Sequence, residues 1–252
     1  MIKLKSEEEI KILKEGGHIL AKIIKEVAKK AKAGVATREL DWLAENLIIK
    51  SGGQPSFKNY QPDFSLNPFP ASLCVSVNNV IVHGIPNDYI LQNGDVVKLD
   101  LGMKYKGLYT DMAITVGVGK ISPLAKKLIH VTKKALDLAI KAAQEGKTLG
   151  DVGFAIQNYV RSQNFYEIRV LTGHGVGYAQ HEEPDVLNYG EPGKGIRLKE
   201  GMVIAIEPMV TIDTSDIIEI FDGSFVTKTG CLSAHFEHTI AITSKGPIIL
   251  TK

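Results

Sequence analysis

The sequence has little cysteine and no long hydrophobic run. Its two cysteines, Cys74 and Cys231, lie far apart and form no Cys-x-x-Cys pair. This excludes a disulfide scaffold and a multi-cysteine zinc module, and it suits a reducing cytoplasm. No apolar stretch approaches the roughly 18 residues of a membrane-spanning helix, and residues 1–9 lack the apolar core of a signal peptide. We therefore expect a cytoplasmic protein without membrane segments.

The chain also lacks an excess of either charge. Its 30 Lys+Arg and 28 Asp+Glu give a net charge of +2, which argues against a specific role in nucleic-acid binding because such proteins carry a basic stripe or a strongly basic total. Residues 1–33 hold nine lysines against five glutamates. A basic face there could contact the ribosome transiently, although a solvated lysine-rich helix is the simpler interpretation.

Capping signals and hydrophobic spacing predict four helices separated by strands. Ser6 with Glu9 forms a capping box before the first helix, in which Gly16-Gly17 is expected to loosen the middle. The others are expected at 37–52, from Ser122-Pro123 towards residue 144, and at 149–162. The predicted strands are 73–77, 80–82, 96–101, 109–118, 168–171, 203–206 and 236–242.

This order of two helices followed by strands occurs twice, and short motifs recur with it. His83-x-x-Pro recurs as His181-x-x-Pro, and the strand pattern of 94–100 recurs at 201–207, each copy ending in a carboxylate. Any single match is weak, but their common order indicates a duplicated α+β unit. We expect one domain, 1–252, built from related halves at about 1–120 and 121–252.

Two carboxylates, Asp100 and Asp111, flank a predicted hairpin. A turn centred on Tyr105-Lys106 would place them directly opposite each other, with Cβ atoms roughly 4.5–5.5 Å apart. Like charges so close are destabilising unless a cation lies between them or one is protonated. A register slip that turns Asp111 towards solvent is the alternative.

Three further residues extend this acidic set. Glu207 ends a buried strand, Glu237 lies in another strand pattern, and His174 is flanked by glycines that let its imidazole approach a ligand. No lysine or arginine occurs in 201–210 or 232–242 to balance the charges. One nitrogen and several oxygen ligands favour Mn, Fe, Co or Zn. Two such ions would suit hydrolysis, because they can hold and activate a water between them.

With these residues the sequence resembles a type I methionine aminopeptidase over nearly its whole length. The matching motifs are Gly-His-Gly-Val-Gly at 173–177, His181, Asn188-Tyr189, Ile-Glu-Pro at 206–208 and Phe-Glu-His-Thr at 236–239. The resemblance implies the α+β pita-bread fold, in which helices pack outside a central antiparallel sheet of two pseudo-symmetric halves. It also implies a monomeric enzyme that removes the N-terminal methionine from nascent proteins and peptides, preferably before a small second residue.

The resemblance further implies a role for each matching position. Two divalent ions (Co, Mn, Fe or Zn) would be held by Asp100, Asp111, His174, Glu207 and Glu237, with Asp111 and Glu237 bridging. Glu207 is similar to the general base, His181 to the residue that stabilises the carbonyl oxygen, and His83 to the one that contacts the amide nitrogen. The pocket for the first side chain resembles the family's at Phe57, Tyr60, Phe69 and Cys74.

The chain departs from the family pattern around this pocket. The segment 61–68 is longer than usual, Gln180 replaces an apolar residue, and the usual Trp near Ser224-Phe225 is missing. These changes affect the pocket and leave the expected metal ligands intact.

Three alternatives share the fold. Xaa-Pro aminopeptidases or dipeptidases usually carry a substantial N-terminal domain before the catalytic one, whereas this chain reaches its first expected catalytic histidine at His83. A type II methionine aminopeptidase would carry a helical insertion that does not fit between His181 and Glu207. A non-catalytic pita-bread binding protein would have lost ligands, and all five are present.

Overall fold

The computed structural model describes residues 2–61 and 67–252. Four helices occupy these ranges. Two starts confirm the predicted caps: the Ser6 side chain accepts a hydrogen bond from the Glu9 amide, and the Ser122 side chain accepts one from the Ala125 amide. The Thr148 side chain, which the sequence analysis did not single out, accepts one from the Asp151 amide. The helices are α1 (Glu7–Lys30), α2 (Thr37–Lys50), α3 (Pro123–Ala142) and α4 (Leu149–Ser162). Among the described residues, no helix is both long and apolar enough to cross a membrane.

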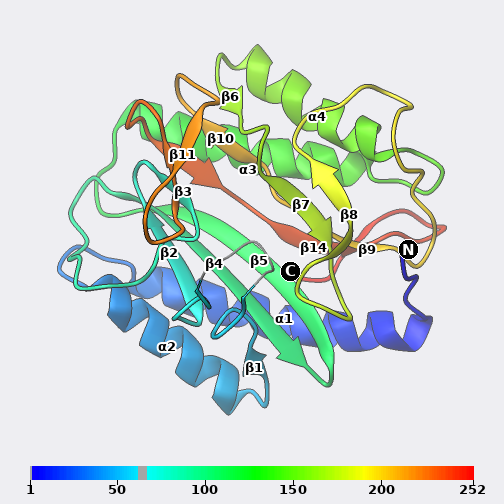
Figure 1. Ribbon diagram of the computed structural model, residues 1–252, viewed down its shortest axis with the longest axis horizontal. Coiled ribbons are helices and arrows are strands. Elements are labelled where there is room, and N and C mark those ends of the chain that lie inside the picture. Colours follow the sequence, from blue (N-terminus) through cyan, green and yellow to red (C-terminus); the bar gives the residue numbers. More distant parts are fainter. Residues whose placement is uncertain (1, 62–66) are drawn as a thin grey trace.

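The first half of the chain forms a sheet covered by α1 and α2. Its long hairpin, β4 (Val96–Tyr105) and β5 (Leu108–Gly117), is extended by β2 (Leu73–Val77) and β1 (Gln54–Pro55), both antiparallel to β4. Helix α1 lies against β4 and β5, and both helices run along the outer side of the sheet (Figure 1). Buried aliphatic side chains of α1, α2, β2 and β4 form the core between them.

In the second half of the chain, α3 and α4 lie on the opposite side of the molecule (Figure 1). Its main sheet has the order β15-β14-β9-β7-β8, and two small sheets have the orders β13-β10-β6 and β11-β12-β3. The remaining strands are β3 (Val80–Val82), β6 (Tyr166–Glu167), β7 (Thr172–Gly175), β8 (Glu182–Leu187), β9 (Val203–Ile206), β10 (Met209–Thr211), β11 (Ile217–Glu219), β12 (Phe225–Thr227), β13 (Ser233–His235), β14 (His238–Ala241) and β15 (Ile248–Ile249).

The halves meet where β5 lies beside the segment that joins β13 to β14. The Thr239 hydroxyl donates to Asp111 O at 2.8 Å and accepts the Asp111 amide at 2.9 Å. Further along β5, the Glu237 amide donates to Ala113 O at 2.9 Å. These bonds fix the strands of the two halves against each other. The division into related halves near residue 120 stays a prediction.

Three expectations about local structure were wrong. Residues 168–171 form no strand; strand structure lies on either side of them, in β6 and β7. The predicted strand at 236–242 is interrupted at Phe236-Glu237, between β13 and β14. Helix α1 is also continuous through Gly16-Gly17, where a looser middle was expected. The glycine at position 17 lets the helix pack closely against the C-terminal segment, since a Cβ there would lie 2.4 Å from Leu250 O.

Candidate metal centre

The β4–β5 hairpin brings Asp100 and Asp111 to one face, but the predicted register was wrong. Asp111 lies opposite Gly102 and Asp100 opposite Ala113, because the turn is centred on Lys106-Gly107. Both turn residues have positive φ, 48° and 88°, as the tight turns that match strand twist require. The two aspartates are therefore diagonal neighbours, and their side chains share a hydrogen bond.

Asp111 is held on all sides. Its side chain is buried, Oδ1 accepts the Met112 amide at 2.9 Å, and Oδ2 accepts a hydrogen bond from the Gln180 side chain. Thr239 fixes its backbone from β14. A carboxylate so restrained has a fixed orientation and keeps lone pairs free for a ligand.

His174 and Glu207 come from adjacent strands of the second half. His174 lies on β7, and Glu207 directly follows β9, which pairs with β7. His174 Nδ1 lies 2.9 Å from Gly175 O; because a carbonyl only accepts, Nδ1 carries the proton and Nε2 keeps its lone pair. That Nε2 lies 3.6 Å from Glu207 Oε1. Burial lowers the pKa of His174 to about 4, so the imidazole is neutral.

Glu237 completes the cluster between β13 and β14. One ligand atom each of Asp111, His174 and Glu237 lies within 4.8 Å of the others, a spacing that a metal ion can bridge. Asp100 adjoins this group through its hydrogen bond to Asp111, and Glu207 through its contact with His174. The structure thus brings together all five sequence-predicted ligands.

The donor set fits a divalent cation. Burial first, and repulsion by neighbouring carboxylates second, raise the pKa values of Asp100, Glu207 and Glu237 well above their usual range; burial raises that of Asp111 to about 7. Within the described ranges, these carboxylates form no ion pair with lysine or arginine. The buried Oδ1 of Asp100 and Oε1 of Glu237 have no hydrogen-bond partner. Buried oxygens that lack both a partner and a counter-charge are the ligands that hard or borderline metals take.

The two histidines predicted to contact substrate are His181, which borders the cluster, and His83. The rings of His181 and His174 lie 4.4 Å apart, centroid to centroid, and His181 Nδ1 lies 2.8 Å from the Tyr60 hydroxyl. His83 follows β3 with φ of 59° and stacks edge-on against Phe225 at 5.6 Å. Surrounding protein lowers the pKa of His83 to about 4 and that of His181 to about 3. Both rings also reach solvent, which limits that shift, and both are neutral at neutral pH.

The predicted pocket residues lie next to these groups. Phe57 and Phe69 meet edge to face, with ring centroids 6.4 Å apart, and the backbones of Tyr60 and Phe69 are hydrogen-bonded. Cys74 pairs with Asp100 across β2 and β4, and burial followed by the charge of Asp100 raises the pKa of its thiol. The longer segment expected at 61–68 falls mostly on residues 62–66, outside the described residues.

His235 is a buried neighbour of the site that the sequence analysis missed. Its Nε2 lies 3.3 Å from Glu207 Oε2, and its backbone is fixed by hydrogen bonds with the Thr115 hydroxyl at 2.6 and 2.9 Å. Neither ring nitrogen has a well-aligned hydrogen bond. The imidazole is thus available to Glu207. Its position two residues before Glu237 was the available signal, because alternate residues of a strand share a face.

Comparison with known proteins identifies the family of the chain that carries this cluster. Residues 11–244 match metallopeptidase family M24. The chain belongs to this family. Within it, methionine aminopeptidase 1 of Bacillus subtilis is 45% identical over 100% of both chains, and the methionine aminopeptidase of Clostridium perfringens is 44% identical over 100% of this chain and 99% of its own. These relatives confirm the resemblance to the type I enzymes.

Solved structures of M24 proteins confirm the pita-bread fold. The methionine aminopeptidase of Thermotoga maritima is 40% identical, with a TM-score of 0.96 and full coverage of both chains. The prolidase of Pyrococcus horikoshii is 27% identical, with a TM-score of 0.77, and this chain covers 63% of it. The family is one of metallopeptidases, in agreement with a divalent-metal site at the carboxylate cluster.

Metal binding at the cluster should tighten as the pH rises. An ion must displace the proton from Asp111, whose pKa of about 7 makes it about one tenth ionised at pH 6 and nine tenths ionised at pH 8. His174 stays neutral over this range and adds no opposing trend. The other three carboxylates, whose pKa values are also raised, lose protons on binding as well, so calorimetric titration with Mn²⁺ should give a Kd at least about tenfold lower at pH 8 than at pH 6. An equal Kd at both values would contradict this account.

Removing the imidazole of His235 should weaken the site. His235→Leu leaves Glu207 Oε2 without its polar neighbour, and the Kd for Mn²⁺ should rise by about 10- to 100-fold, as for the loss of other groups that orient metal ligands. His235→Gln keeps a side-chain N–H and should stay within a few-fold of the unmodified protein. If both variants bind Mn²⁺ as tightly as the unmodified protein, His235 does not support the site.

Proposed function

We propose that this metal-dependent aminopeptidase removes the N-terminal methionine from nascent proteins and peptides, preferably when the second residue is small. The observation that carries the proposal is the buried cluster of Asp111, His174 and Glu237, with Asp100 and Glu207 beside it, in a chain whose methionine aminopeptidase relatives match it over their full length. The alternative is an Xaa-Pro peptidase of the same fold, to which the chain is less similar.

Two divalent ions, Co, Mn, Fe or Zn, would be held by Asp100, Asp111, His174, Glu207 and Glu237. When bound, such ions supply a Lewis acid for the scissile carbonyl and lower the pKa of a water molecule. Four carboxylates would balance the charge of the two ions, which explains why no lysine is needed at the site. The restrained Asp111 would present its carboxylate to them in a fixed orientation.

Glu207 would move the proton. In the reaction a water oxygen bonds to the carbonyl carbon, the C–N bond breaks, and a proton must travel from the water to the departing amine. Glu207 Oε1 faces His174 and Oε2 faces His235, so the carboxylate is held at the edge of the ligand set and can accept the proton before passing it on.

His181 and His83 would contact the peptide. If the Tyr60 hydroxyl donates to Nδ1 of His181, the imidazole carries its proton on Nε2 and can donate it to the carbonyl oxygen under attack. His83 would contact the amide nitrogen that leaves. Phe57, Tyr60, Phe69 and Cys74 would surround the methionine side chain, whose polarisable thioether suits aromatic walls.

Peptide hydrolysis by the pure protein tests the function. With Mn²⁺ or Co²⁺ added, we expect release of methionine from Met-Gly peptides and at least about tenfold lower kcat/KM on Xaa-Pro peptides, because discrimination of this size needs only about 1.4 kcal/mol. The reverse preference would establish the alternative. His174→Ala should abolish turnover, since the only nitrogen ligand is lost; wild-type turnover with metal bound would refute the assignment.

We also propose a monomeric cytoplasmic enzyme that contacts the ribosome transiently through α1. Lys22, Lys25 and Lys29 lie on one exposed stretch of this helix. Replacing these three and Lys32 by glutamine should weaken salt-sensitive cosedimentation with ribosomes, while hydrolysis of a tripeptide stays unchanged. Equal cosedimentation of both proteins would discard the contact.

A further inference from the structure

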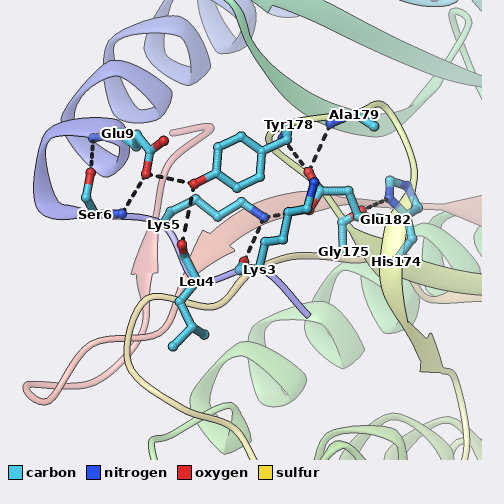
Figure 2. A network of polar contacts seen from close by, with 10 residues as sticks. All are labelled: Lys3, Leu4, Lys5, Ser6, Glu9, His174, Gly175, Tyr178, Ala179 and Glu182. Atoms are coloured by element: carbon cyan, nitrogen blue, oxygen red, sulfur yellow. Dashed lines mark hydrogen bonds and ion pairs between the residues drawn. The ribbon is translucent and has the colours of Figure 1, made fainter. Parts of the chain in front are cut away.

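The N-terminal segment 3–6 runs across the loop that connects β7 to β8, as Figure 2 shows. The Lys5 amide donates to Gly201 O at 2.7 Å, which fixes the backbone of the segment against the second half. From the other side, the Tyr109 amide donates to Gly177 O at 2.8 Å. The loop is therefore held between the start of the chain and the β4–β5 hairpin.

A buried ion pair links this segment to the base of the loop. Lys5 Nζ lies 2.7 Å from Glu182 Oε2, and the two side chains are only 2% and 12% exposed. Glu182 directly follows His181. An ion pair withdrawn from water is costly unless further hydrogen bonds satisfy its atoms, and the Glu182 carboxylate has them. Its Oε1 accepts the backbone amides of Tyr178 and of Ala179, the latter at 2.9 Å (Figure 2).

The lysine stem packs directly on the loop. A Cβ on Gly177 would lie 2.5 Å from Lys5 Cε, and Gly177 has a φ of 137°, so both space and backbone conformation call for glycine there. Tyr178 adds a second link: its hydroxyl donates to Glu9 Oε2 at 2.9 Å, and Lys5 Nζ lies 4.8 Å from the centre of its ring. Glu9 belongs to the capping box of α1.

The loop so restrained ends in two residues of the site. Gln180 is buried and donates to Asp111, while His181 stacks beside His174. The His181 side chain is itself exposed to solvent. Its placement therefore depends on its backbone, on the hydrogen bond with Tyr60 and on the ring contact with His174. The residue that anchors this backbone, Glu182, is the partner of Lys5.

We propose that Lys5 is a positioning residue for the reaction: through Glu182, it holds His181 in the orientation that meets the substrate carbonyl. Lys5 itself touches no substrate. The inference rests on the role proposed for His181 above.

A double-mutant cycle between Lys5 and His181 tests the proposal. Lys5→Met keeps the apolar stem and removes the charge; kcat on a Met-Gly peptide should fall by about 10- to 100-fold, as for small misplacements of a catalytic group, with a smaller change in KM. In a His181→Ala protein the same substitution should lower kcat less than about twofold, because the group it positions is gone. A full, additive loss in both backgrounds would show a general structural role and overturn the proposal.

Matched variants separate Lys5 from its surroundings. Lys3→Met alters a neighbouring lysine near the same tyrosine ring, at 5.6 Å, and should leave kcat unchanged. Tyr178→Phe removes only the hydroxyl, with its bonds to Glu9 and to Leu4 O, and should fold normally. It should lower kcat a few-fold in the unmodified background and not in His181→Ala, so it carries the test if Lys5→Met does not fold.

A readout without turnover keeps this proposal distinct from the proposed function. The imidazole ¹⁵N signals of His181 should shift or broaden in Lys5→Met and remain in place in Lys3→Met. Unchanged signals in Lys5→Met would overturn the positioning role, whatever peptide the enzyme cleaves. A His181→Ala protein with unimpaired kcat would likewise overturn it, whereas absence of methionine release by the unmodified protein would contradict only the proposed function.

Discussion

Four carboxylates lie where the two halves of the chain meet, and their combined negative charge has to be neutralised. Those of Asp111 and Glu237 are buried, and those of Asp100 and Glu207 are half-buried. Burial favours the protonated forms of all four, and repulsion by neighbouring carboxylates adds to it at Asp100, Glu207 and Glu237. Protons can meet this demand in the empty site, and divalent cations can meet it at neutral pH with His174 as the nitrogen ligand. Buried carboxylates that would destabilise an ordinary core thus suit this cluster to divalent-metal binding.

The side chains proposed to bind metal come from both halves of the fold, and hydrogen bonds restrain their positions. The long hairpin contributes two aspartates, the second sheet contributes His174 and Glu207, and Thr239 joins the halves with a reciprocal pair of hydrogen bonds to Asp111. Helices on both outer sides bury the aliphatic faces of the strands and leave the ligand-bearing centre between them (Figure 1). Residues remote in sequence, such as Lys5 and Glu182, form an ion pair that restrains the loop between β7 and β8 beside the site.

Much of this arrangement could be predicted from local sequence patterns. Capping residues such as Ser6 and Ser122 mark helix starts because their side chains accept hydrogen bonds from free backbone amides. The motifs that carry the candidate ligands are short and contiguous in the sequence. The hairpin register could not be predicted in the same way, because two adjacent turn centres differ only in which residues adopt positive φ. The residues with positive φ are Lys106 and Gly107, so Asp111 pairs with Gly102 and Asp100 lies diagonal to it. Lys5 was missed because its partner Glu182 lies far away along the chain, where local patterns carry no information. For His235 the one local signal was its spacing from Glu237, since its partner Glu207 is also remote in sequence.

Anomalous X-ray scattering from crystals of the Mn²⁺-loaded protein tests the central claim most directly. The account predicts manganese peaks within bonding distance of Asp111, His174 and Glu237, extending to Asp100 and Glu207. Crystals whose protein hydrolyses Met-Gly peptides while manganese lies elsewhere, with the five side chains uncoordinated, would contradict it.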